Sequence, residues 1–173
     1  MSVMAQATKA VEQARNAYNA GNYQVGVALL QPFVGPGARK LSSRIELDVV
    51  KWLSAGHRGL GDDRAALPHA QRWLELTMQL HPPRSRQHAE ALQELCEVQV
   101  GLKTLDDARK TITDALAIMD KLGLRKDAVY GGMLLTLGSV ESDQGHCKEA
   151  LVTYIKARLC WSTSRTGPIT EWS

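Results

Sequence analysis

The stretch LGSVESDQGHCKEALVTYIKA, residues 137–157, holds the pattern that decides the fold. A Leu-Gly pair begins it, Gly145 follows eight residues after Leu137, and Ala150 follows five residues after Gly145. Tyr154 and Ala157 then continue at intervals of four and three residues, which place all three side chains on one face of a helix. Because a glycine readily ends a helix in a left-handed conformation, the stretch predicts two antiparallel helices joined at Gly145.

The same pattern occurs three more times along the chain. The copies start at positions 21, 61, 103 and 145, so they are separated by 40, 42 and 42 residues. The matching Leu-small pairs upstream are Leu53-Ser54 and Leu95-Cys96, with the weaker pair Gln13-Ala14 in the first copy. One helical hairpin cannot bury its apolar face alone, so the repeats are expected to stack on one another. The residues of the three earlier copies are Gly21, Gly26, Leu30 and Phe33; Gly61, Ala66, Ala70 and Trp73; and Lys103, Ala108, Ile112 and Ala115.

This pattern resembles the tetratricopeptide repeat (TPR), and the resemblance covers roughly residues 5–160. Its period exceeds the usual repeat of about 34 residues and is similar to the extended repeats of kinesin light chain. The first copy departs from the family pattern with Gln13 and Gly26, and the third has Lys103 in place of the turn glycine. The resemblance implies an all-α, right-handed superhelical solenoid built from about four antiparallel helix hairpins.

The domain organisation predicted from the pattern is one TPR-like repeat domain, residues 1–161, followed by a loose C-terminal tail, 162–173. The repeats are expected at about 5–36, 41–81, 84–123 and 127–161. Breaks are predicted at Gly35-Pro36-Gly37 and His81-Pro82-Pro83, and Gly123 is expected to cap a helix. Pro68 should kink a helix or mark a late helix start. The predicted helices are 3–19, 23–33, 41–59, 63–80, 84–101, 105–122, 127–144 and 147–161.

The composition argues against several classes of protein. The formal charge of +3 comes from 21 basic and 18 acidic residues that are scattered, which does not favour a nucleic-acid binder. The chain has no apolar stretch long enough to predict a signal peptide or a membrane span. Cys96, Cys147 and Cys160 form no Cys-x-x-Cys pair, so a zinc or redox site lacks support. We therefore expect a soluble, cytoplasmic protein with reduced thiols.

Known catalytic motifs are also missing from the sequence. None of the five histidines has the His-Glu-x-x-His spacing of a zinc hydrolase, and no serine lies in Gly-x-Ser-x-Gly. The loop from Gly35 to Lys40 has glycines and basic residues, but Leu41 stands where a phosphate loop needs Ser or Thr. We therefore predict that the protein is not an enzyme and needs no cofactor or metal.

The resemblance implies a function and a set of binding positions. In TPR arrays the first helix of each hairpin lines a concave groove that binds a partner peptide or protein. Trp52 is either an interface anchor flanked by positive charge or a residue packed between helices. Glu90, Glu94 and Glu97 share a helix face, which is either an acidic patch for a basic partner or a solvated surface. The groove positions carried over are Arg15, Tyr18, Lys51, Trp52, Arg58, Gln93, Glu94 and Glu97, with Thr136, Ser139 and Ser142 in the last repeat.

The C-terminal hairpin supports an alternative function. Solenoids normally close with a polar capping repeat, and the sequence shows none. The last hairpin is therefore expected to leave an apolar face that includes Leu151, Tyr154 and Trp161. This face would be covered by the tail, by a second copy, or by further repeats of a longer protein. The alternative is accordingly an assembly module that forms homo-oligomers through this hairpin.

Overall fold

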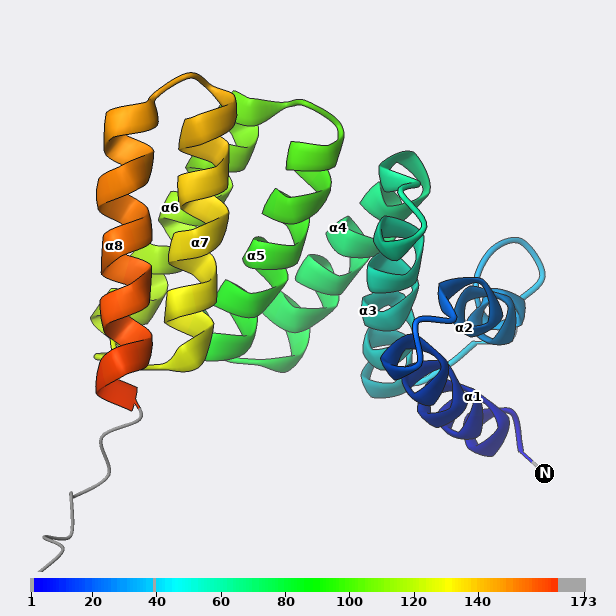
Figure 1. Ribbon diagram of the computed structural model, residues 1–173. Helices are drawn as coiled ribbons and strands as arrows, with labels where there is room; N and C mark the ends of the chain where they lie inside the picture. Colours follow the sequence, from blue (N-terminus) through cyan, green and yellow to red (C-terminus); the bar gives the residue numbers. More distant parts are fainter. Residues whose placement is uncertain (1, 39, 165–173) are drawn as a thin grey trace, which may run out of the picture. The chain divides into compact units, whose positions relative to one another are not determined.

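The structure is a computed structural model that describes residues 2–38 and 40–164 (Figure 1). The chain divides into two compact units. The first unit contains Met1–Pro83 and Gly101–Lys103, and the second contains Arg84–Val100 and Thr104–Ser173. All regular secondary structure in the described residues is helical, which confirms the predicted all-α class.

Two hairpins form the first unit. Helices α1 (Val3–Asn19) and α2 (Tyr23–Leu30) form one hairpin, which is followed by a short 3₁₀ helix, η1 (Gln31–Phe33). Helices α3 (Ser43–Gly59) and α4 (Asp63–Leu80) form the other, and α3 packs against both α1 and α2. The helices meet along a core of mainly small and aliphatic residues. That core consists of Ala7, Ala10, Ala14, Tyr18, Leu30, Leu41, Val49 and Leu53.

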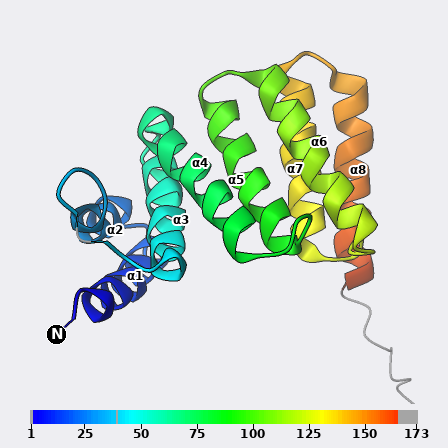
Figure 2. The same cartoon turned by 180° about the vertical axis from the view of Figure 1, so that it is seen from behind.

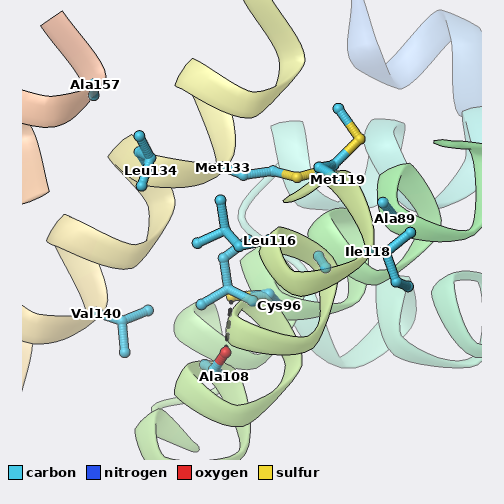
Figure 3. Packing of buried hydrophobic residues seen from close by; sticks show 12 residues of the cluster. Ala89, Cys96, Ala108, Leu116, Ile118, Met119, Met133, Leu134, Val140 and Ala157 are labelled. Atoms are coloured by element: carbon cyan, nitrogen blue, oxygen red, sulfur yellow. Dashed lines mark hydrogen bonds between the residues drawn. The ribbon is translucent and has the colours of Figure 1, made fainter. Parts of the chain in front are cut away.

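Two more hairpins form the second unit. They consist of α5 (Arg86–Gly101) with α6 (Leu105–Lys121), and α7 (Ala128–Asp143) with α8 (Cys147–Ser164). Helices α7 and α8 lie side by side in both views of the chain (Figures 1 and 2). Figure 3 shows the core, in which Met119 and Met133 lie close together and Cys96 donates a hydrogen bond of 3.2 Å to the carbonyl of Ala108.

The four hairpin turns share one backbone geometry. Gly21, Gly61 and Gly145 have φ angles of 77°, 74° and 82°, which are left-handed values. Lys103 takes the same conformation, with φ at 62°, although it carries a side chain. The next residue then closes each turn, as Thr104 does by donating its N–H to the carbonyl of Gln99 at 3.0 Å. The third repeat therefore keeps the turn at a cost of about 1 kcal/mol instead of losing it.

The two helices of the last hairpin are matched in side-chain size. Gly138 on α7 lies under the ring of Tyr154 on α8, and a Cβ on Gly138 would lie 2.6 Å from Tyr154 Cε1. The equivalent positions of the third repeat hold Cys96 and Ile112, which are both fully buried. The smallest residue thus faces the largest partner. The equivalent pairs of the first and second repeats are Ala14 with Leu30 and Ser54 with Ala70, all of them 0% exposed.

The structure corrects several predicted boundaries. Helix α2 ends at Leu30, because Pro32 turns the following residues into the 3₁₀ helix η1. Helix α4 begins at Asp63, where Asp62 caps it by accepting the N–H of Ala65 at 3.1 Å, so Pro68 does not mark a late start. Helix α5 begins at Arg86, since Arg84 is left-handed and Ser85 accepts the N–H of His88.

Other ends differ by one to three residues. Helix α3 begins at Ser43, two residues after its predicted start, and α6 and α7 are shorter than predicted by one and two residues. Gly123, with φ at 71°, caps α6 as expected. Helix α8 runs to Ser164, so residues 162–164 of the predicted tail are helical. The remaining tail, 165–173, lies outside the described residues. Across the described part of the chain, each helix is too short or too polar to span a bilayer.

Candidate functional site

The predicted groove positions of the first unit lie at different depths. Arg15 on α1 is exposed, whereas Lys51, Trp52 and Arg58 on α3 are half-buried. Tyr18 is buried, with 8% of its surface exposed. Its ring fills the space left by the missing side chains of Gly26 and Gly56. Tyr18 is therefore a core residue, which corrects its expected place at the surface of a groove.

Trp52 belongs partly to the core and partly to the surface. Its ring lies 5.8 Å from that of Tyr18 at an interplanar angle of 34°, and the side chain packs against the first core. Neighbouring Lys51 places its ammonium group 5.2 Å from the centroid of the Trp73 ring, at cation–π distance. Trp52 thus packs partly between helices, which leaves its predicted anchor role as a prediction, and Lys51 and Arg15 supply positive charge on the same two helices.

Three of the predicted groove residues of the second unit are connected by hydrogen bonds. Gln93 Nε2 donates to Glu97 Oε1 at 3.0 Å within α5, and Thr136 Oγ1 on α7 lies 3.5 Å from the same carboxylate oxygen. Thr136 also donates to the carbonyl of Gly132 at 3.2 Å. Gly132 itself leaves open space, because an added Cβ would meet only Gln93 Nε2 at 3.7 Å. We call Gln93, Glu97, Gly132 and Thr136 the polar row.

Gly132 is the member of this row that sequence reasoning missed. Its position inside a predicted helix could have drawn attention to it, because glycine there lowers stability by about 0.5–1 kcal/mol relative to alanine. The remaining predicted positions lie outside the row. Glu94 is 8% exposed and buried, whereas Ser139 and Ser142 are exposed. Ser139 accepts a hydrogen bond of 3.3 Å from the Tyr154 hydroxyl, so Tyr154 faces α7 and does not lie on the open face predicted for it.

A cavity of about 390 Å³ lies beside α3 and α4 in the first unit, and the sequence did not predict it. Arg72 lines it and donates hydrogen bonds to Glu46 at 2.7 Å and to Glu75 at 3.0 Å, which raise the pKa of Arg72 above its usual range. The wall of the cavity is therefore mainly apolar and carries one ion pair, between Arg72 and Glu46. Its lining is Phe33, Val34, Gly35, Ala38, Lys40, Leu41, Glu46, Val50, Pro68, His69 and Arg72.

Solved structures with a similar fold include the TPR-like repeats of a putative kinesin light chain from Podosopora anserina. That match has a TM-score of 0.78 and 16% identity, and it covers 96% of this chain and 79% of the other. The fold is a TPR-like repeat fold. No family model and no curated protein matches the sequence.

Two further structures share the TPR-like fold. The apo form of RapI has a TM-score of 0.76 at 16% identity over 95% of this chain, and this chain spans 58% of RapI. BtubC from P. vanneervenii has a TM-score of 0.66 at 18% identity, covering 95% of this chain and 74% of BtubC. The kinesin-light-chain-type resemblance seen in the sequence is thus confirmed at the level of fold.

The three cysteines of the TPR-like chain differ in exposure, with Cys96 buried and Cys147 exposed. Burial raises the pKa of Cys96 to about 12, so this thiol is a poor nucleophile at neutral pH. Within residues 2–38 and 40–164, no three His, Cys, Asp or Glu side chains lie close enough together to hold a metal ion.

A stacked histidine pair in the first unit should make stability depend on pH. The rings of His57 and His69 lie 5.6 Å apart at 11°, and burial, together with the neighbouring His57, lowers the pKa of His69. The unfolded chain therefore binds a proton more readily, so stability should fall as the pH drops below about 6.5. In thermal melts between pH 8 and pH 5, His69→Gln should flatten this decline.

His146→Gln is the matched control, because His146 is exposed on the second unit. Some decline should remain in His69→Gln, because burial also lowers the pKa of His88. A pH profile of His69→Gln that is identical to wild type would show that the stacked pair has no effect on stability.

Proposed function

We propose that the protein is a non-catalytic scaffold that binds a protein or peptide partner through the first helices of its hairpins. The polar row is the observation that carries this proposal. An amide, a carboxylate and a hydroxyl are gathered there on two neighbouring helices, beside Gly132, which has no side chain to cover them. Such groups can bond to the main chain and the polar side chains of a peptide, and Glu97 favours a partner with donors or positive charge.

The surface formed by α1 and α3 supports the same function with different chemistry. Arg15 is exposed and Trp52 is half-buried, and both residue types are frequent anchors at protein interfaces. The positive charge of Arg15 and Lys51 suits an acidic segment of a partner. We place the protein in the cytoplasm as part of this proposal, which is consistent with the exposed thiol of Cys147.

The test begins with a partner identified by cross-linking the tagged full-length chain in cells. Binding is then measured by calorimetry with the triple variant Gln93→Ala, Glu97→Ala and Thr136→Ala. Loss of two or three hydrogen bonds of about 0.5–1.5 kcal/mol each should weaken binding about tenfold or more. Cross-links to α5 and α7 are also expected.

The matched control is Thr113→Ala with Asp114→Asn, because both residues are exposed on α6. This control should bind like the wild type, and circular dichroism should show unchanged helix content in both variants. If the triple variant binds as tightly as the control, the polar row is not the binding site and the proposal fails.

A further inference from the structure

Helix α8 is apolar on two opposite faces. Ala150, Thr153 and Ala157 are buried, with 3%, 7% and 0% exposed, on the face that packs within the second unit. On the opposite face Leu151, Val152 and Ile155 are 60%, 51% and 52% exposed. At 100° per residue these three side chains share one sector of the helix, and Leu159, at 57%, extends the sector by one turn. We call Leu151, Val152 and Ile155 the outer face of α8.

The equivalent face of the preceding hairpin is polar. Shifting by one repeat of 42 residues, the outer face corresponds on α6 to Arg109, Lys110 and Thr113. Lys110 and Thr113 are exposed even though α7 packs beside α6. Arg109, the equivalent of Leu151, is half-buried and lies 3.9 Å from Glu141 of α7. A further repeat after α8 would therefore still leave Val152 and Ile155 uncovered. A missing further repeat therefore does not explain why Val152 and Ile155 are apolar. Exposed contiguous apolar residues commonly mark an interface.

The charges beside the outer face show which partner fits it. Glu149 and Lys156 are exposed, two helical turns apart along the same edge of the outer face. Neither has an ion-pair partner among the described residues. If a second α8 lies antiparallel across the first, with a two-fold axis near Val152, Glu149 of each copy lies opposite Lys156 of the other. The face is thus complementary to itself in charge, and it brings apolar residues of both copies together.

We propose that the outer face of α8 pairs with the same face of a second copy, in an antiparallel, two-fold symmetric dimer. Leu151 and Val152 pack at its centre, Ile155 packs on either side, and two Glu149–Lys156 pairs close the edge. Because one helix face buries less area than a standard interface, the dimer is weak and depends on concentration. This role is separate from partner binding at the polar row.

The first experiment is sedimentation of the full-length chain over a wide concentration range. The wild type should form a dimer as concentration rises. The double variant Leu151→Ser with Ile155→Ser should raise the dissociation constant at least tenfold, with unchanged helix content. The matched control is Lys110→Ala with Thr113→Ala, at the equivalent positions of α6, and it should dimerise like the wild type.

The second experiment tests the orientation. Glu149→Lys and Lys156→Glu should each weaken the dimer, because each places like charges opposite one another. A mixture of these two variants should form heterodimers, and the two substitutions in one chain should restore the homodimer. A wild type that stays monomeric would overturn the proposal and assign the face to residues 165–173 or to a different protein. The proposal would also be overturned if Leu151→Ser with Ile155→Ser, or the charge changes, left the dissociation constant of the dimer unchanged.

Discussion

Tyr18→Ala should lose about 3–5 kcal/mol of unfolding free energy, which is the usual cost of removing a buried aromatic ring. The ring contacts Tyr23 and Trp52, with centroids 5.7 and 5.8 Å away, and it fills the space above Gly26 and Gly56. No neighbouring side chain can replace that volume, because two of the surrounding positions are glycines. Urea denaturation followed by circular dichroism measures the loss.

Tyr18→Phe should be as stable as the wild type or more stable by about 1 kcal/mol. The Tyr18 hydroxyl is buried without a hydrogen-bond partner among the described residues, and burial raises its pKa to about 12. Removing it therefore removes an unsatisfied polar group. Tyr23→Phe, at a 36% exposed position, is the control and should change little. Weaker partner binding by Tyr18→Phe at unchanged stability would contradict the core assignment and return Tyr18 to the binding surface.

Gly138→Ala should destabilise the protein by about 1–3 kcal/mol, although alanine is the better helix former. The new methyl group would lie 2.6 Å from Tyr154 Cε1 and 3.0 Å from Tyr154 Cζ, so the ring must shift. The ring is tethered by its bond to Ser139 on the same helix as Gly138. Thermal and urea melts of the single variant measure the effect.

Two further variants distinguish crowding from a general effect of glycine replacement. Gly132→Ala on the same helix enters open space and should be neutral or stabilising by up to about 1 kcal/mol. Adding Tyr154→Leu to Gly138→Ala reproduces the residues found at Ala14 and Leu30 and should recover part of the loss. If Gly132→Ala and Gly138→Ala have equal effects, the size-matching argument is wrong.

The fold was predictable because each hairpin carries its own local signals. Gly21, Gly61 and Gly145 mark turns, and the spacing of small and large apolar residues marks the packed helix faces. Even Lys103, which lacks the glycine signal, takes the same left-handed turn, because the flanking helices determine the connection. Helix ends were predicted less well where a single proline or capping serine decides them, as at Pro32 and Ser85.

The candidate site was less predictable, because the burial of each side chain depends on residues from several helices. Tyr18 occupies a surface position in the repeat pattern, yet Gly26 and Gly56 create the space that draws its ring inward. The polar row requires Gln93 and Thr136, 43 residues apart, to meet at one carboxylate of Glu97. On α8, one run of apolar residues supplies both a buried and an exposed face, which a linear pattern does not separate.

The size matching between α7 and α8 also limits how such a protein can change over time. Gly138 suits only a helix that brings a ring across it, and Cys96 suits a helix with a smaller residue at that place. Exchange of a single helix between repeats would therefore create a clash or an empty space. Exchange of a complete hairpin would preserve both partners. The hairpin, and not the helix, is thus the unit by which this array can be duplicated, recombined or rebuilt in the laboratory.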